Sequence, residues 1–213
     1  VPDKYWQRFK DKPLVQFATE AQQEVPAETL CALAMLDNQD ENVGRLLHKL
    51  DELGLSENTI VIYFSDNGPN TWRWNGGMKG RKGSVDEGGL RSPLLIRWPG
   101  KIRPGTVIGE IAGAIDLLPT LTTLAGVPRV GQKPLDGVDL SPLLRGQAEH
   151  LLERLIFSHQ NGMISVRSSQ YRLDNGGGLF DLTADPGQAR NIATAQPAVA
   201  ARLSQAVATW KRD

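Results

Sequence analysis

The sequence of 213 residues contains only one cysteine, Cys31, so an intrachain disulfide framework is excluded. Cys31 is most simply a small apolar residue on a predicted helix. No apolar run is long enough to predict a membrane-spanning helix, and no signal peptide pattern is visible. Neither sign of charge is in excess, because 24 basic residues balance 24 acidic ones. This balance removes any general electrostatic argument for nucleic acid binding, and a hydrophobic content of 40% is typical of a globular protein.

The most informative stretch begins with a predicted strand, Thr59–Phe64, which the turn sequence SDNGP ends abruptly. In an α/β sheet, ligands bind beyond the carboxyl ends of parallel strands. Asp66 and Asn67 at this point can supply two hard oxygen ligands to a divalent cation. A glycine-rich loop with two cations, Arg81 and Lys82, follows, and such cations neutralise anionic oxygens. The residues alone therefore indicate a candidate metal and oxyanion site, but they leave open an ordinary Asx-Gly turn before a flexible loop.

Several short motifs occur in order between residues 66 and 100. They are Asp66-Asn67-Gly68, Lys82-Gly83-Ser84, Glu87-Gly88-Gly89, Arg91, Pro93 and Arg97-Trp98-Pro99-Gly100. In combination they closely resemble the C-terminal half of the sulfatase family, arylsulfatase-like members of the alkaline phosphatase superfamily. The resemblance extends from about Val1 to Asp213 and so covers almost the whole chain.

The motif that supplies the nucleophile of the family is absent from the sequence. Sulfatases oxidise a Cys or Ser within Cys/Ser-x-Pro-x-Arg to formylglycine, whereas Cys31 precedes Ala-Leu-Ala-Met and no Ser-x-Pro-x-Arg occurs. The paired aspartates of the first metal-binding strand and the His-x-Pro segment of the family are missing as well. The first residues look like those that follow His-x-Pro. The sequence is therefore interpreted as a sulfatase without its N-terminal half, and we expect it to be inactive alone.

The resemblance implies roles for particular residues. Asp66 and Asn67 match two ligands of the family's metal, usually calcium, and Lys82 matches the catalytic lysine that contacts the sulfate or its ester oxygen. Arg81 is expected to have no direct role and to face solvent. His159 ends a predicted strand at a position from which the C-terminal subdomain could reach the substrate, although a hydrogen-bonded structural histidine is the alternative.

Other residues near the candidate site have less specific interpretations. The sequence Glu87-Gly88-Gly89 is expected to shape the loop and not to touch substrate. Trp72 and Trp74 could line a rim that binds sugar or aryl groups, or could simply pack. His48 has no carboxylate or thiolate partner at ligand spacing, so a surface or packing histidine is predicted.

Hydrophobic periodicity predicts an α/β fold with a mainly parallel sheet flanked by helices, plus a small C-terminal antiparallel sheet with a covering helix. The expected helices are Pro26–Leu53, Ile115–Ala125 (capped by Asp116), Ser141–Leu144 and Pro197–Arg212. The expected strands are Thr59–Phe64, Ser92–Trp98, Leu155–Ser158, Met163–Ser168, Tyr171–Asp174 and Gly178–Leu182. In the first helix, one apolar face is formed by Leu36, Val43, Leu47 and Leu50.

The predicted organisation has three parts. Residues 1–130 form the C-terminal portion of the sulfatase catalytic domain, residues 131–150 a linker rich in proline and glycine, and residues 151–213 an α+β subdomain. Because the absent half would contribute sheet strands, we expect an exposed apolar sheet edge or face that favours association.

The resemblance implies hydrolysis of sulfuric esters, with sulfated glycans or aryl sulfates as substrates, and a periplasmic or secreted location. Two alternatives remain at this stage. One is a phosphoester or phosphonate hydrolase of the same superfamily, whose nucleophile would be an unmodified Thr or Ser. The other is a non-catalytic binding or assembly module. An in-frame Cys/Ser-x-Pro-x-Arg encoded upstream of Val1 would favour the sulfatase.

Overall fold

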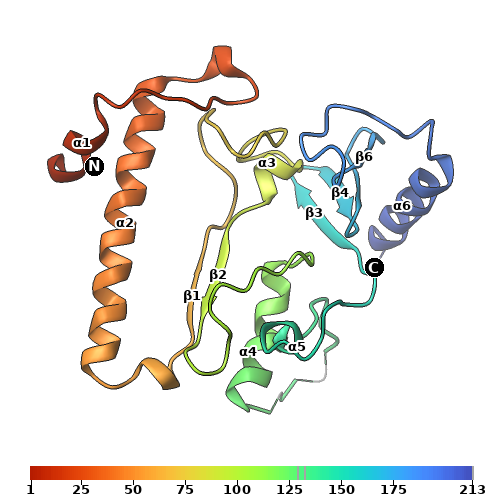
Figure 1. The fold of residues 1–213 in the computed structure, drawn as a ribbon. Helices are drawn as coiled ribbons and strands as arrows, with labels where there is room; N and C mark the ends of the chain where they lie inside the picture. The colour runs from red at the N-terminus through yellow and green to blue at the C-terminus, as the bar shows by residue number, and fades with distance from the viewer. Residues whose placement is uncertain (129, 132, 213) are drawn as a thin grey trace.

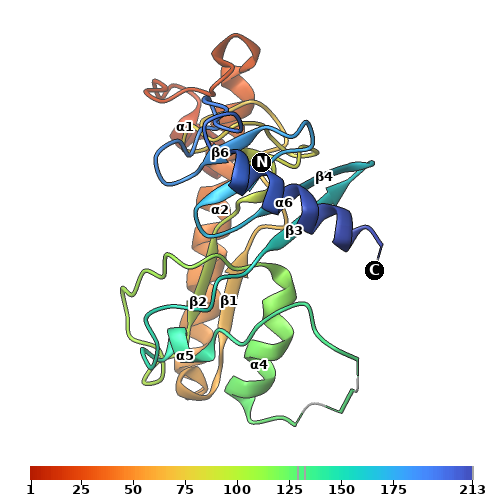
Figure 2. The same ribbon diagram turned by 90° about the vertical axis from the view of Figure 1, so that its right-hand side faces the viewer.

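The computed structural model describes residues 1–128, 130–131 and 133–212. Arg129, Gln132 and Asp213, which fall within the predicted divisions 1–130, 131–150 and 151–213, lie outside the described residues. Along the chain, a long helix is followed by a two-stranded sheet with short helices, and then by a four-stranded sheet covered by a helix (Figures 1 and 2).

The N-terminal part consists of α1 (Asp3–Phe9), α2 (Pro26–Glu52) and the 3-10 turns η1 (Ala21–Gln23) and η2 (Ser56–Asn58). The predicted first helix is confirmed: Pro26 occupies its first turn, where a missing N–H costs nothing, and the left-handed Gly54 follows its end. Helix α2 packs against α1, where Tyr5 is buried. The buried residues of α2 lie near its start, whereas Leu36 on the predicted apolar face is 53% exposed.

The central sheet contains β1 (Val61–Phe64) and β2 (Leu94–Arg97), which pair antiparallel. The prediction of both strands is confirmed, but a mainly parallel sheet is not found among the described strands, whose pairs are all antiparallel. A parallel pair needs a crossover, usually a helix, that returns the chain to the starting edge. The connection between these strands contains only the short helix α3 (Glu87–Leu90), and the chain re-enters beside β1 in the opposite direction (Figure 1).

Helix α4 (Leu117–Ala125) and helix α5 (Ser141–Leu144) follow, with the 3-10 turn η3 (Ala114–Asp116) before them. They cover the end of the central sheet where β1 begins and β2 ends. Their core is formed by Leu124, Leu140, Leu143 and Leu144, against which Ile60, Ile96 and Trp98 pack. Residues 140–144 of the predicted linker are thus part of a packed core.

Asp116 occupies the N-cap position of α4, as expected, but its side chain makes no capping hydrogen bond to that helix. Its carboxylate accepts hydrogen bonds from the backbone N–H groups of Gly113 and Val138, each at 2.8 Å, and pairs with Arg154 at 2.9 Å. The side chain is fully buried, so these partners compensate for its loss of water. Asp116 therefore ties the start of α4 to the segment before α5.

The C-terminal part is an antiparallel sheet in the order β3 (Ile156–Gln160), β4 (Met163–Arg167), β5 (Tyr171–Leu173) and β6 (Leu179–Asp181). Helix α6 (Pro197–Trp210) covers one face of it, as predicted (Figure 2). Leu203 from α6 is fully buried among Val166, Leu173 and Leu179 of the strands. This subdomain therefore has an apolar core of its own.

Apolar side chains are exposed on the central sheet. Phe64 is 50% exposed and Leu95 is 63% exposed, in agreement with the expected apolar sheet surface. Within the described residues, no helix has the length and apolarity needed to cross a membrane.

Candidate functional site

The turn that carries Asp66 and Asn67 directly follows β1 and is held by hydrogen bonds to neighbouring loops. The hydroxyl group of Ser92 donates to the carbonyl oxygen of Ser65 at 2.6 Å, and the N–H of Gly68 donates to the carbonyl of Gly89 at 2.9 Å. A Cβ atom at Gly68 would overlap the backbone carbonyl of Gly88, so only glycine fits here. The turn is thus built against α3.

Lys82 belongs to the glycine-rich loop, and its backbone connects this loop to the same turn. The N–H of Lys82 donates to the carbonyl of Pro69 at 2.9 Å, three residues after Asp66. The structure therefore places the main chain of Lys82 beside the turn with both predicted metal ligands. The sequence had indicated one candidate site for these residues from their types and order, without showing which contact joins them.

The side chains of Asp66, Asn67 and Lys82 form no hydrogen bonds or ion pairs within the described part of the chain. Asp66 and Lys82 are exposed and Asn67 is half-buried. Their oxygen and nitrogen atoms are thus available to a ligand. Among the residues described, no group of three or more His, Cys, Asp and Glu side chains is arranged for a metal ion.

Arg81 was expected to face solvent, but its side chain contacts other residues of the loop. Its Nη1 donates to the carbonyl of Asn70 at 2.8 Å, and its guanidinium lies 5.3 Å from the centre of the Trp72 ring. Trp72 therefore packs within the loop, while Trp74 is exposed. Arg81 and Trp72 support the shape of the segment between the turn and Lys82.

Within the described ranges, His159 makes no polar contact with the other predicted site residues. His159 is exposed on β3, opposite Ile164 of β4. Its role in substrate binding stays a prediction.

A cavity of about 350 Å³ opens beside Asp66, between the ends of β1 and β2 and the C-terminal sheet. Its polar lining includes Glu87, Arg167 and Arg172, whereas Phe64 and other apolar residues form much of the remainder. Burial lowers the pKa of Arg167; Glu87 opposes this shift, and the nearby positive charge of Arg172 adds to it. The lining of the cavity therefore contains charged groups of both signs, with Arg167 and Arg172 paired to Glu87.

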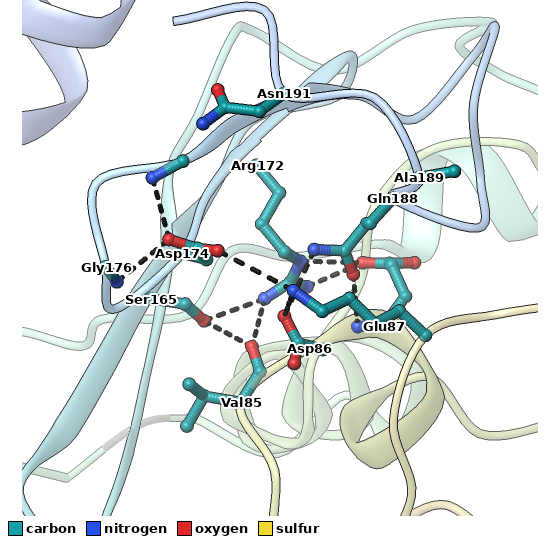
Figure 3. Close-up of polar contacts among 12 residues, drawn as sticks. Val85, Asp86, Glu87, Ser165, Arg172, Asp174, Gly176, Gln188, Ala189 and Asn191 are labelled. Carbon is teal, nitrogen blue, oxygen red and sulfur yellow. Dashed lines mark hydrogen bonds and ion pairs between the residues drawn. The ribbon is translucent and has the colours of Figure 1, made fainter. Parts of the chain in front are cut away.

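A buried polar cluster behind the loop was missed by sequence reasoning (Figure 3). Glu87 is only 1% exposed, and its Oε1 accepts hydrogen bonds from Arg172 Nη2 at 2.6 Å and Nε at 3.1 Å. Arg172 Nη1 donates to the carbonyl of Val85 at 2.9 Å and to the hydroxyl of Ser165 at 2.8 Å. Gln188 Oε1 accepts from the N–H of Glu87 at 2.8 Å. The sequence separation of 85 positions between Glu87 and Arg172 explains why no local pattern reveals the pair.

Comparisons with known proteins show which family the chain belongs to. The family model described as Sulfatase matches residues 4–127, and that described as N-sulphoglucosamine sulphohydrolase, C-terminal, matches residues 81–212. Human (Homo sapiens) arylsulfatase A is 43% identical over 160 residues, which cover 69% of this chain and 31% of that protein. Mouse (Mus musculus) steryl-sulfatase is 40% identical over 141 residues, which cover 62% of this chain and 23% of that protein. The chain therefore spans about a third or less of these relatives.

Solved structures show the same fold. The crystal structure of Ps i-CgsB in complex with k-i-k-neocarrahexaose has a TM-score of 0.79 at 23% identity, covering 99% of this chain and 46% of that one. The structure of BT4656 in complex with its substrate D-glucosamine-2-N,6-O-disulfate has a TM-score of 0.66 at 25% identity, covering 84% of this chain and 39% of that one. The family models together extend over nearly all of the sequence, and the chain belongs to the sulfatase family.

Proposed function

We propose that this chain supplies the metal-binding and sulfate-binding portion of a sulfuric ester hydrolase of the arylsulfatase type. The observation that carries the proposal is the hydrogen bond from the Lys82 N–H to the carbonyl of Pro69. It joins the turn with two oxygen donors to the loop with a free ammonium group. In a member of the sulfatase family, the two oxygen ligands suit a divalent cation, and the ammonium group suits an anionic ester beside that cation.

Calcium fits the donor set of Asp66 and Asn67, because a carboxylate and an amide carbonyl are hard oxygen ligands. Both side chains lack competing partners among the described residues, so they are available for a cation. They would fill two of the roughly six to eight oxygen positions that calcium takes, and binding by this chain alone is expected to be weak. When bound, the cation would screen the negative sulfate oxygens.

Lys82 would contact the sulfate group or its ester oxygen. Negative charge increases on the leaving oxygen as the ester bond breaks, and a positioned ammonium group stabilises that charge. No Cys/Ser-x-Pro-x-Arg is present to supply the formylglycine nucleophile of the family. We therefore propose that this chain is inactive alone.

The substrate class we propose is a sulfated glycan, with aryl sulfates as simple test substrates. The support is the carbohydrate named with two structurally similar proteins, neocarrahexaose in one and a disulfated glucosamine in the other. His159 is proposed as a substrate contact from the C-terminal subdomain. A periplasmic or secreted location is proposed from family membership.

Calcium titration of this chain, followed by calorimetry, tests the metal site without requiring activity. We expect Asp66→Ala and Asn67→Ala each to weaken binding by at least about tenfold, since each removes one of few ligands. Asp11→Ala is the matched control, because Asp11 is exposed and is paired only at 3.9 Å with Lys10. Equal affinity in all variants would remove Asp66 and Asn67 from the metal site.

An enzyme completed with a nucleophile-bearing N-terminal half tests the reaction. Sulfate ester hydrolysis that is lost together with metal in Asp66→Ala would support the proposal. Cleavage of phosphate esters but not sulfate esters would instead favour a phosphoester hydrolase of the superfamily.

A non-catalytic binding or assembly module is the second candidate. It is favoured by the exposed apolar side chains of Phe64 and Leu95. A completed enzyme that hydrolyses neither ester would support this candidate.

A further inference from the structure

We propose that Arg172 is a positioning residue, which acts through Glu87 to hold the glycine-rich loop that carries Lys82. The inference deepens the proposed function, and its catalytic consequence rests on that function. Its structural part rests on the contacts between the C-terminal sheet and residues 79–89.

The pair of Glu87 and Arg172 lies out of contact with water. The Glu87 side chain is 1% exposed and that of Arg172 is 4% exposed. Removing two charges from water is costly, and it is tolerated where both groups are paired and hydrogen-bonded. Here each nitrogen of the guanidinium has an acceptor, since Nη1 binds the carbonyl of Val85 and the hydroxyl of Ser165 while Nε and Nη2 bind Glu87. Because each guanidinium nitrogen is paired, this contact fixes the distance and angle between the C-terminal sheet and α3.

Further contacts extend the attachment on both sides of Glu87. Arg167 Nη1 lies 3.3 Å from Glu87 Oε2, so the second carboxylate oxygen is also paired. Gln188, from the loop after β6, accepts from the Glu87 N–H and donates through Nε2 to Asp86 Oδ1 at 3.2 Å. Strands β4 and β5 and this loop therefore meet on two consecutive residues at the start of α3 (Figure 3).

A second attachment lies at the other end of the loop. Lys79 Nζ is 3.7 Å from Asp174 Oδ2 and 3.6 Å from Asp86 Oδ1, and it also lies 5.2 Å from the centre of the Phe180 ring. The Asp174 carboxylate is fixed by two backbone N–H groups of the turn before β6. Lys79 is 40% exposed, so this contact is weaker than the buried pair. Residues 79 and 87 thus bracket the segment that contains Lys82.

The path from Glu87 to Lys82 consists of short backbone contacts. The N–H of Gly88 donates to the carbonyl of Lys79 at 2.7 Å, and the carbonyl of Gly89 accepts from Gly68 at 2.9 Å. A Cβ atom at Gly88 or Gly89 would overlap backbone atoms of residues 79–84, so the segments are in direct contact. A shift of Glu87 must therefore move the loop of Lys82 and the turn of Asp66 together.

Amide hydrogen exchange of the 213-residue chain tests the structural part directly. In Arg172→Gln, which leaves Glu87 without its main partner, we expect the amides of Gly68, Lys82 and Gly88 to exchange at least about tenfold faster, with α4 unchanged. Arg172→Lys retains the charge but not the fork of donors, and it should restore part of the protection.

Leu203→Ala is the control that separates positioning from general stability. Leu203 is fully buried in the core of the same subdomain but does not belong to the polar cluster. We expect this variant to increase exchange in β4, β5, β6 and α6, with a much smaller effect at Lys82. The proposal is overturned if Leu203→Ala loosens the loop as much as Arg172→Gln does, or if Arg172→Gln leaves the loop unchanged.

Gln188→Ala keeps the proposal testable if Arg172→Gln does not fold. It removes only the acceptor for the Glu87 N–H and the donor to Asp86. Faster exchange of the Lys82 and Gly88 amides supports the attachment, and unchanged exchange counts against it.

Kinetics of a completed enzyme then test the catalytic consequence. Arg172→Gln should lower kcat on an aryl sulfate by about tenfold or more with little change in KM, and Arg172→Lys should recover part of kcat. Unchanged kcat in Arg172→Gln, despite a loosened loop, would overturn the catalytic role of this positioning. If the unsubstituted enzyme cleaves no sulfate ester, the proposed function fails, while the exchange experiment still decides whether Arg172 holds the loop.

Discussion

The four-stranded sheet and the long helix α2 bury their apolar side chains to very different extents. Leu179 on the sheet and Leu203 on α6 are fully buried within one cluster. On α2, Leu36 and several other large apolar residues are exposed, and the helix packs mainly against α1. The C-terminal subdomain is therefore stabilised by contacts among its own residues, whereas α2 and the central strands present apolar surface outward.

The candidate site lies where these two regions meet. Asp66 lies in the turn after β1, an apolar strand with an exposed end, and Lys82 lies in a loop that the C-terminal sheet holds through buried polar groups. We propose a division of roles: the subdomain fixes the geometry of the site, and the exposed apolar region provides a surface for association. Substitutions in each region can test this division.

The largest difference in the free energy of unfolding is expected between substitutions of core leucines and of surface leucines. Leu179→Ala should lower the free energy of unfolding by about 2–5 kcal/mol, because it removes buried methyl groups and leaves a cavity. Leu95→Ala, at a position 63% exposed, should change it by within roughly 0.5 kcal/mol. Urea unfolding monitored by circular dichroism measures both values. Equal losses would show that the central strands are packed as tightly as the sheet.

A large effect on catalysis is expected at Lys82. In a completed enzyme, Lys82→Ala should raise the activation barrier on an aryl sulfate by about 2.7–4 kcal/mol, or 10² to 10³ in rate, because it removes a donor to developing charge. Arg81→Ala should cost about 0.5–1.5 kcal/mol in stability, the typical net value of one hydrogen bond, with a small effect on rate.

The pair of variants also tests the assignment of the loop. If Arg81→Ala were the inactive variant and Lys82→Ala nearly normal, the correspondence with the family motif would be displaced by one residue. If both were nearly normal, the loop would not contact the sulfate.

Much of this fold follows from local patterns in the sequence. The alternation and turn signals after residue 155 predict β3 to β6, and Asn161-Gly162 forms the expected turn with positive φ at both residues. Helix α2 follows from its first-turn proline and its terminal glycine. The direction of β2 relative to β1 could not be derived this way, since hydrophobicity reports burial but not strand orientation.

The candidate site was predictable only in part. The residue types of Asp66, Asn67 and Lys82 indicate metal and anion binding even when their neighbours in the fold are unknown. The buried pair of Glu87 and Arg172 is invisible locally, because a charged residue in a short strand is ordinarily expected to face solvent. Only the tertiary structure shows that the C-terminal sheet binds the start of α3.

A moderate effect is expected on association through the central strands. Leu95→Lys places a charge on the exposed apolar surface, and it should weaken self-association of this chain by roughly tenfold, about 1.4 kcal/mol. Sedimentation velocity over a concentration series measures the change. Lys101→Ala, at an exposed polar position, is the control. A monodisperse monomer at all concentrations would contradict the expected role of this surface.

The smallest effect concerns acid stability of the C-terminal subdomain. Burial by itself would raise the pKa of Asp181, but hydrogen bonds from Gln170 and from the N–H groups of Thr183 and Ala184 outweigh it, and the pKa lies below its usual value. These bonds stabilise the fold fully at pH values above the unfolded-state pKa, and their contribution is lost as the pH falls through the lower folded-state pKa. Because the turn is largely open to solvent, the loss should be on the order of 0.5 kcal/mol, below about pH 4. Asp181→Asn should therefore flatten the dependence of unfolding free energy on pH in this range, whereas Asp11→Asn should not. An unchanged dependence in Asp181→Asn would show that other carboxylates, outside this turn, set the acid stability of the subdomain.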